Sequence, residues 1–258
     1  MSKNQRTMSK NQRNTTDLEE IKRLAKTLLH MEPEPVEQMP IFVRHPFTNS
    51  GFVGLRGTDG SLRIGNIIEC QSDRNQWRQQ MTEIINDSDS AMRIYHLVEK
   101  QYLLGFFKYA APHLSQEDYA GILADAWIRC EEPNHDPNLS QNKLLAMFRT
   151  ADPMFLMNDQ ERKCLEELPD TVTVYRGVRS DRGSGVHALS WTLEPQTAQW
   201  FANRYSRRGQ VYEAKISKQH IYALFHGRGE SEIILNPKHL MELTQVQQMA
   251  SDMKMERI

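Results

Sequence analysis

Residues 190–202 read Ser-Trp-Thr-Leu-Glu-Pro-Gln-Thr-Ala-Gln-Trp-Phe-Ala, and this stretch decides the expected fold. Its first three residues alternate polar and apolar side chains, which is typical of a half-buried strand. Pro195 follows, and proline is well suited to the first position of a helix. Ala198 and Ala202 lie one turn apart and leave room for close packing. The stretch therefore predicts a strand that runs into a closely packed helix.

Further strands are predicted on both sides of this stretch, because the hydrophobic pattern changes from helical to alternating after Pro169. The expected strands cover residues 171–176, 188–192, 211–216, 221–225 and 231–235. One helix, over 194–205, interrupts them, and 244–258 is expected to form a final helix or a tail. This part of the chain is predicted to be a strand-rich α+β lobe.

The residues before Pro169 carry helical patterns instead. Helices are expected over 90–110, from Ser115, from Ser140 through Phe148, and over 159–168. Asp118 stands at the capping-box position that follows Ser115. The aromatic side chains of these helices fit a hydrophobic core better than a cofactor site.

A smaller module is expected between residues 16 and 86. Leu18, Ile21, Ala25, Leu28 and Leu29 follow helical spacing. Short strands are expected over 41–44, 51–56 and 61–69, with a hairpin turn at 58–60, and a helix from Ser72 through Ile85. No chemistry follows from this module. Its first helix packs on its own domain or, alternatively, docks a partner protein.

Residues 1–14 are a tandem repeat, in which Met-Ser-Lys-Asn-Gln-Arg occurs twice. The repeat is too polar to pack and is expected to be disordered. A duplicated start explains it best, and contact with an acidic partner is the alternative. The expected organisation is thus a tail over 1–15, an N-terminal α/β module over 16–86, and a third domain over 87–258. Within that third domain, helices span 88–168 and a β core spans 169–245.

The composition is that of an ordinary soluble protein and does not point to a membrane protein. Charged residues make up 25% and hydrophobic residues 39% of the chain, with a net charge of −1, as in ordinary soluble proteins. Residues 176–229 hold nine Lys/Arg against three Asp/Glu, which suits phosphates or, equally, a solvated surface. No apolar run approaches a membrane span and no signal peptide is evident, so no membrane is expected as a partner.

The cysteines and the lack of several known motifs exclude further kinds of functional site. Cys70, Cys130 and Cys164 make neither a zinc spacing nor a disulfide framework, so a reducing cytoplasm is the expected location. The chain holds no dinucleotide-binding glycine fingerprint, no Walker loop and no nucleophile elbow. Cys130 and His135 could suggest a thiol enzyme, but nothing in the sequence orders them into a catalytic triad.

Three short pieces carry the candidate chemistry. They are Val174-Tyr175-Arg176-Gly177, Ser190-Trp191-Thr192 and Glu230-Ser231-Glu232. They supply a cation, a pair of hydroxyls and a pair of carboxylates on three expected strands. Side chains alternate along a strand, so Glu230 and Glu232 are expected on one face. Each piece alone is common on exposed strands, but together they can hold a dinucleotide and break a glycosidic bond.

With these pieces and the stretch over 190–202, the chain resembles the mono-ADP-ribosyltransferase superfamily, in its Arg–Ser–Glu branch. That branch includes arginine-modifying bacterial toxins and their phage and animal relatives. The resemblance covers about residues 88–245 and rests on positions between Val174 and Leu235. It implies an ADP-ribosyltransferase-type β core, NAD as the substrate and no metal. The family's Ser-Thr-Ser is replaced by Ser190-Trp191-Thr192, so Trp191 departs from the pattern.

The resemblance also implies roles for individual residues. Glu232 corresponds to the family's catalytic glutamate, and Glu230 to the glutamate that orients the acceptor. Ser190 is expected to hold Glu232 and to contribute to NAD binding. Arg176 is expected to hold the phosphates of NAD, with Thr192 and Phe201 as further NAD contacts. Trp191 is expected in the core.

Several alternatives for the acceptor and the activity remain. The Glu-x-Glu spacing favours protein arginine as acceptor, and a base of RNA or DNA is the alternative. The loop over 222–228 and the turn over 206–209 are candidate contacts with either target. The family suggests a toxin of a toxin–antitoxin or phage-conflict system, with a neutralising protein as a further partner. A plain NAD-hydrolysing enzyme and a non-enzymatic interaction module are the other two hypotheses.

Overall fold

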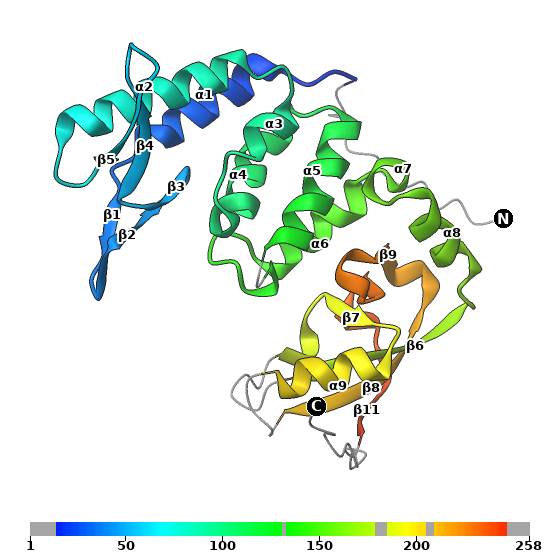
Figure 1. Cartoon of the computed structure of the whole chain (residues 1–258). Helices are drawn as coiled ribbons and strands as arrows, with labels where there is room; N and C mark the ends of the chain where they lie inside the picture. Colours follow the sequence, from blue (N-terminus) through cyan, green and yellow to red (C-terminus); the bar gives the residue numbers. More distant parts are fainter. Residues whose placement is uncertain (1–13, 131–132, 179–184, 205–208, 247–258) are drawn as a thin grey trace, which may run out of the picture. The chain divides into compact units, whose positions relative to one another are not determined.

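The structure is a computed structural model that describes residues 14–130, 133–178, 185–204 and 209–246 (Figure 1). It contains both helices and sheets, so the predicted α+β class is confirmed at that level. The chain divides into two compact units. The first unit comprises residues 1–139 and 150–156, and the second comprises 140–149 and 157–258. The predicted boundary at residues 86 and 87 falls inside the first unit, so the single domain over 87–258 stays a prediction.

The first unit combines six helices with two small antiparallel sheets, counted over its described residues. One sheet has the order β1-β2-β3 and the other is the hairpin β4-β5. The helices are α1 (Leu18–Leu29), α2 (Gln71–Asp87), α3 (Ala91–Tyr95), α4 (Leu103–Ala110), α5 (Gln116–Arg129) and α7 (Pro153–Leu156). The strands are β1 (Glu34–Val36), β2 (Met39–His45), β3 (Thr48–Ser50), β4 (Phe52–Arg56) and β5 (Leu62–Asn66).

Local signals predicted two features of this unit correctly. The turn between β4 and β5 lies at 58–60, where Gly60 adopts φ 82°. Such a left-handed backbone is easily reached only by glycine. Helix α5 begins after Ser115, whose hydroxyl accepts a hydrogen bond from the backbone N–H of Asp118 at 3.1 Å.

The single helix predicted over 90–110 is wrong. The structure has α3, a 3-10 turn at Lys100–Tyr102 and then α4. The backbone N–H of Glu99 donates to the carbonyl oxygen of Pro46 at 2.8 Å instead of to a helical partner. A contact with a remote segment therefore interrupts a pattern that is helical on its own.

The second unit is built on one six-stranded antiparallel sheet of order β11-β8-β6-β7-β10-β9. Its strands are β6 (Thr171–Val178), β7 (Ser190–Thr192), β8 (Gln210–Ser217), β9 (Ile221–Phe225), β10 (Glu232–Leu235) and β11 (Met241–Val246). Its helices are α6 (Gln141–Thr150), α8 (Asp159–Glu167) and α9 (Pro195–Asn203). The predicted strands are all present. The strand over 221–225 has the predicted ends, the others have shifted ends, and the strand predicted to end at Arg176 continues to Val178.

Helix α9 packs directly on β6 and β8, as Figure 1 shows. Ala198 and Ala202 are fully buried in this contact, which confirms the close packing predicted from their spacing. Gly177 of β6 makes it possible. A Cβ at Gly177 would lie 2.0 Å from the carbonyl oxygen of Ala198 and 2.5 Å from the backbone nitrogen of Ala202. The strand therefore needs glycine at the point where the helix crosses it.

The opposite side of the sheet forms the larger core cluster. Val172 and Val174 of β6 pack there with Trp191 of β7 and Ile233 of β10, and all four are buried. Leu165 of α8 covers part of this cluster. Hydrophobic side chains thus pack on the sheet in two clusters, and the neighbouring strands β6, β7 and β10 carry the candidate site.

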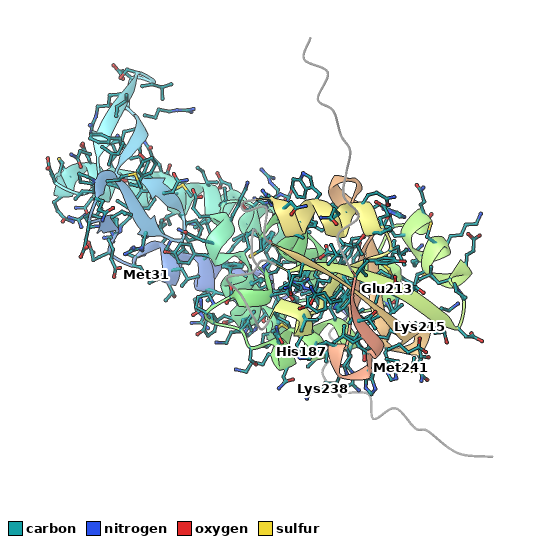
Figure 2. The ribbon with its side chains drawn as sticks, turned by 90° about the horizontal axis from the view of Figure 1, so that it is seen from below. Met31, His187, Glu213, Lys215, Lys238 and Met241 are labelled. Carbon is teal, nitrogen blue, oxygen red and sulfur yellow. The ribbon has the colours of Figure 1, made fainter. Side chains whose placement is uncertain are left out.

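Strand β11 forms one edge of the sheet, where a helix or tail was predicted over 244–258. Residues 241–246 pair with β8, and residues 247–258 lie outside the described part of the chain. Lys215 of β8 is in register with Met241, and Figure 2 shows the two near each other. Lys215 Nζ also lies 2.6 Å from Oε2 of Glu242. Strand pairing overrides the helical tendency of this segment. The predicted tail over 1–15 likewise lies mostly outside the described residues.

Candidate functional site

Arg176, Ser190 and Glu232 lie on β6, β7 and β10, which are neighbours in the sheet. The register places Thr192 of β7 between Tyr175 of β6 and Glu232 of β10. Arg176 is next to Tyr175, and Ser190 is two residues from Thr192. Three segments that are remote in sequence therefore meet within one small area of the sheet.

Ser190 and Glu232 are joined by a hydrogen bond from the serine hydroxyl to Oε1 of the glutamate. Both side chains are half-buried. A hydrogen bond to a carboxylate is stronger than one between neutral groups and fixes the direction of the acceptor. The contact implied by the resemblance is present, and its catalytic meaning stays a prediction.

Arg176 lies on β6 next to Tyr175, and the pairing of β6 with β7 is recorded at one position, Tyr175 with Thr192. Its Nε donates to the carbonyl oxygen of Gly185 at 2.6 Å, and its Nη1 donates to the carbonyl oxygen of Ser190. The guanidinium thus supplies hydrogen bonds that a longer strand ladder would otherwise make. Among the described residues, Nη2 makes no hydrogen bond, so donors remain that can meet an anion.

The charge of Arg176 is set by its surroundings. Burial lowers the pKa of its guanidinium to about 10, and the negative charge of Glu232 opposes this shift. The side chain is therefore a cation at neutral pH. Arg176, Ser190 and Glu232 form one connected chain of cation, carbonyl, hydroxyl and carboxylate.

Glu230 does not share a strand face with Glu232, so that expectation is wrong. Strand β10 begins at Glu232, and Ser231 adopts φ 37°, in the left-handed region. Glu230 itself closes the 3-10 turn Gly227–Gly229 with φ −100° and ψ −2°. The alternation of side chains along a strand does not apply before Glu232. Glu230 belongs to a turn that leads into the strand.

Thr192 holds that turn. Its side chain is 6% exposed, and its hydroxyl donates to the carbonyl oxygen of Glu230 at 2.9 Å. The hydroxyl oxygen of Thr192 also accepts from the backbone N–H of Glu194 at 3.1 Å. The hydroxyl is thus engaged within the protein, and the expected contact of Thr192 with NAD stays a prediction.

The two aromatic candidates differ in their surroundings. Trp191 is buried in the core, where its Nε1 donates to the carbonyl oxygen of Ala188 at 3.1 Å, so the expected core position is confirmed. Phe201 of α9 is half-buried and meets the ring of Trp200 edge to face, at 4.9 Å between centroids. Its contact with NAD stays a prediction.

Glu194 was missed as a site residue. Its Oε1 accepts from the hydroxyl of Ser231 at 2.6 Å, and its Oε2 accepts from the hydroxyl of Thr197 at 2.8 Å. These two hydrogen bonds, with the nearby His226, hold the pKa of Glu194 below its usual range. A signal existed in the sequence. Glutamate directly before Pro195 occupies the N-cap position, where Ser, Thr, Asp or Asn is usual.

Glu161 of α8 was missed as well. It is 7% exposed, and its Oε2 accepts from the backbone N–H of Asn158, which completes a capping box. Its Oε1 accepts from the backbone N–H of His226 at 2.9 Å. The spacing Asn158-x-x-Glu161 signals the cap, but nothing local signals the contact with His226.

Other expected contacts and sites complete the description. The turn predicted over 206–209 lies mostly outside the described residues. Within the described ranges, no group of three or more His, Cys, Asp or Glu side chains is arranged to hold a metal ion. No helix in the described part of the chain is long and apolar enough to span a membrane.

Comparisons with known proteins add no assignment to this geometry. No protein-family model matches the chain, and neither the curated proteins nor the solved structures give a match. The functional conclusion therefore depends on the arrangement of Arg176, Ser190 and Glu232 and on the motifs that carry the resemblance.

Proposed function

We propose that this protein is an NAD-dependent mono-ADP-ribosyltransferase with the corresponding type of β core. The observation that supports the proposal most directly is the connected set of Arg176, Ser190 and Glu232 on three adjacent strands. A cation for phosphates and an oriented carboxylate lie together, which is the pairing that cleavage of a dinucleotide at its ribose requires.

Glu232 is the catalytic residue in this proposal. The bond between ribose C1′ and nicotinamide breaks through an oxocarbenium-like state, and nicotinamide leaves with the electron pair. The carboxylate of Glu232 hydrogen-bonds the neighbouring 2′-hydroxyl and stabilises the positive charge that develops on the ribose. Ser190 keeps one oxygen of this carboxylate in a fixed position. Arg176 binds the pyrophosphate with the donors that its contacts with Gly185 and Ser190 leave available.

Glu230 orients the acceptor. A nitrogen of the acceptor forms the new bond to C1′, and its proton passes to the carboxylate of Glu230. Protein arginine is the proposed acceptor, because the resemblance associates Glu-x-Glu with arginine. The excess of nine Lys/Arg over three Asp/Glu in residues 176–229 supports a nucleic-acid base as the alternative.

The biological setting belongs to the same proposal. We place the enzyme among intracellular toxins of toxin–antitoxin or phage-conflict systems, with a neutralising protein as partner. The three cysteines are free thiols in the structure, which fits a reducing cytoplasm.

The proposal is tested by incubating the protein with NAD and measuring released nicotinamide. Wild type should release nicotinamide, and Glu232→Gln should not, because the amide cannot stabilise the developing charge. The control is Glu167→Gln, which changes an exposed carboxylate of α8 and should retain full activity. Absence of release from wild type would contradict the enzymatic function and favour an interaction module.

A second measurement identifies the acceptor. NAD labelled in its adenylate half is added to a cell lysate with the protein, and the macromolecules are precipitated. Label that protease removes indicates a protein acceptor, and label that nuclease removes indicates nucleic acid. Release of free ADP-ribose without any precipitable label would identify an NAD-hydrolysing enzyme instead.

A further inference from the structure

The turn that carries Glu230 contains a strained residue. Ser231 adopts φ 37°, a region that residues other than glycine rarely occupy. Such a conformation is unfavourable and persists where the surrounding structure holds it. The contacts of Ser231 with neighbouring elements therefore determine where Glu230 lies relative to Glu232.

Three hydrogen bonds from the end of β7 hold this turn. The hydroxyl of Thr192 donates to the carbonyl oxygen of Glu230 at 2.9 Å, and the backbone N–H of Leu193 donates to the carbonyl oxygen of Ser231 at 3.2 Å. The side chain of Ser231 donates to Glu194 at 2.6 Å. The last contact is the only one of the three in which a side chain of the turn itself takes part.

The other end of the same loop is also attached to a carboxylate. The backbone N–H of His226 donates to Glu161 of α8 at 2.9 Å. Residues 226–231 are thus held at the first residue by Glu161 and at the last by Glu194. Between these attachments lie Gly227, Gly229 and Glu230, and the two glycines leave the backbone of this segment flexible on its own. The position of Glu230 therefore depends in part on these two attachments, together with the hydrogen bonds from Thr192 and Leu193.

We propose that Glu194 is a positioning residue that controls transfer of ADP-ribose to the acceptor by holding Ser231 and, through it, Glu230. This inference rests on the proposed function. Glu232 is held separately, by Ser190 and by its place in β10. Loss of the Glu194–Ser231 contact should therefore displace Glu230 while leaving Glu232 in position. NAD cleavage continues and transfer to the acceptor fails.

The test compares two rates in Glu194→Ala, Ser231→Ala and the double variant. Cleavage is measured as nicotinamide released in buffer, and transfer as precipitable label from adenylate-labelled NAD in lysate. Each single variant should lower transfer about tenfold and change cleavage less than about threefold. The double variant should match the single variants, since both remove the same contact.

The matched control is Thr197→Ala. Thr197 donates to Oε2 of Glu194, whereas Ser231 donates to Oε1. Its removal should leave the ratio of transfer to cleavage unchanged. Equal losses of cleavage and transfer in Ser231→Ala, or an equal effect of Thr197→Ala, would overturn the positioning role.

Ser231→Gly separates positioning from backbone strain. Glycine adopts φ 37° easily but makes no hydrogen bond to Glu194. If the losses in Ser231→Ala come only from strain, Ser231→Gly should restore transfer, and that result would contradict the proposal. If the contact with Glu194 matters, Ser231→Gly should remain defective in transfer.

Hydrogen exchange of peptides that cover residues 226–231 provides a readout without activity. Exchange should be faster in Glu194→Ala and Ser231→Ala than in wild type and Thr197→Ala. If wild type neither cleaves nor transfers, the proposed function fails, and the exchange data still decide whether Glu194 holds the turn. Unchanged exchange in both alanine variants would overturn the inference even in an active enzyme.

Discussion

The hydroxyl of Ser190 donates a hydrogen bond to the carboxylate of Glu232, across 42 residues of sequence. The carbonyl oxygen of Ser190 accepts a hydrogen bond from the guanidinium of Arg176. Ser190 is therefore the central member of the site, with its backbone holding the cation and its side chain holding the carboxylate. Replacement of its side chain separates these two contributions.

Ser190→Ala should lower the rate of nicotinamide release by about tenfold to a hundredfold, since a hydrogen bond to a charged group contributes about 1.5–3 kcal/mol. The carbonyl oxygen that accepts from Arg176 remains in this variant. Steady-state kinetics with NAD should show the loss mainly in kcat. An unchanged kcat would show that Ser190 does not orient Glu232 for the reaction.

Arg176→Ala should destabilise the second unit by about 1–3 kcal/mol, because it leaves partly buried carbonyl groups without this donor. The carbonyl groups of Gly185 and Ser190 both lose a hydrogen bond. Arg176→Lys should recover only part of the stability, since lysine lacks the planar fork that reaches both oxygens. Urea unfolding measures the effect. Full recovery of stability in Arg176→Lys would contradict the bridging role.

Gly177→Ala should destabilise the protein by about 1–3 kcal/mol or prevent folding, because the new methyl group overlaps the backbone of α9. The Cβ would lie 2.0 Å from the carbonyl oxygen of Ala198. Gly54→Ala is the control, since no atom beyond the adjoining residues lies within 4 Å of a Cβ at that position. Thermal unfolding of both variants should show a large effect for Gly177 and a small one for Gly54.

His45 should make stability depend on pH. Its ring is buried, accepts from the backbone N–H of Phe47 and meets Trp77 edge to face, and burial lowers its pKa to about 4. In the unfolded chain the pKa returns to about 6.5. The unfolded state therefore binds the proton first, and the free energy of unfolding falls as pH decreases from about 6.5 to about 4, by about 3 kcal/mol.

The pH effect is measured by urea unfolding between pH 4 and 8. His45→Gln should remove this part of the pH dependence, whereas His30→Gln, which changes an exposed side chain of the same unit, should retain it. An identical pH profile for wild type and His45→Gln would exclude His45 as the cause.

Features that depend on near neighbours were predictable from the sequence. The hairpin turn at 58–60, the helix start at Ser115 and the close packing of Ala198 with Ala202 all follow from residues a few positions apart. The three strands that carry Arg176, Ser190 and Glu232 were also predicted, because alternation of polar and apolar side chains is a local property.

Features that depend on contacts between remote segments were not predictable from the sequence. The interruption between α3 and α4 requires the carbonyl oxygen of Pro46, and the partners of Arg176 are the carbonyl groups of Gly185, in a 3-10 turn, and of Ser190, on β7. The left-handed turn at Ser231 is held by Glu194, 37 residues away.

The amino-acid pattern thus specified which residue types would stand on which strands, since local propensity and periodicity are enough for that. Strand order and register then decided which of those residues meet. The position of Glu230 is the clearest case. Its neighbours in sequence predict a strand, but Ser231, Thr192 and Glu194 place it in a turn, because hydrogen bonds from a neighbouring strand outweigh the local preference of a short segment.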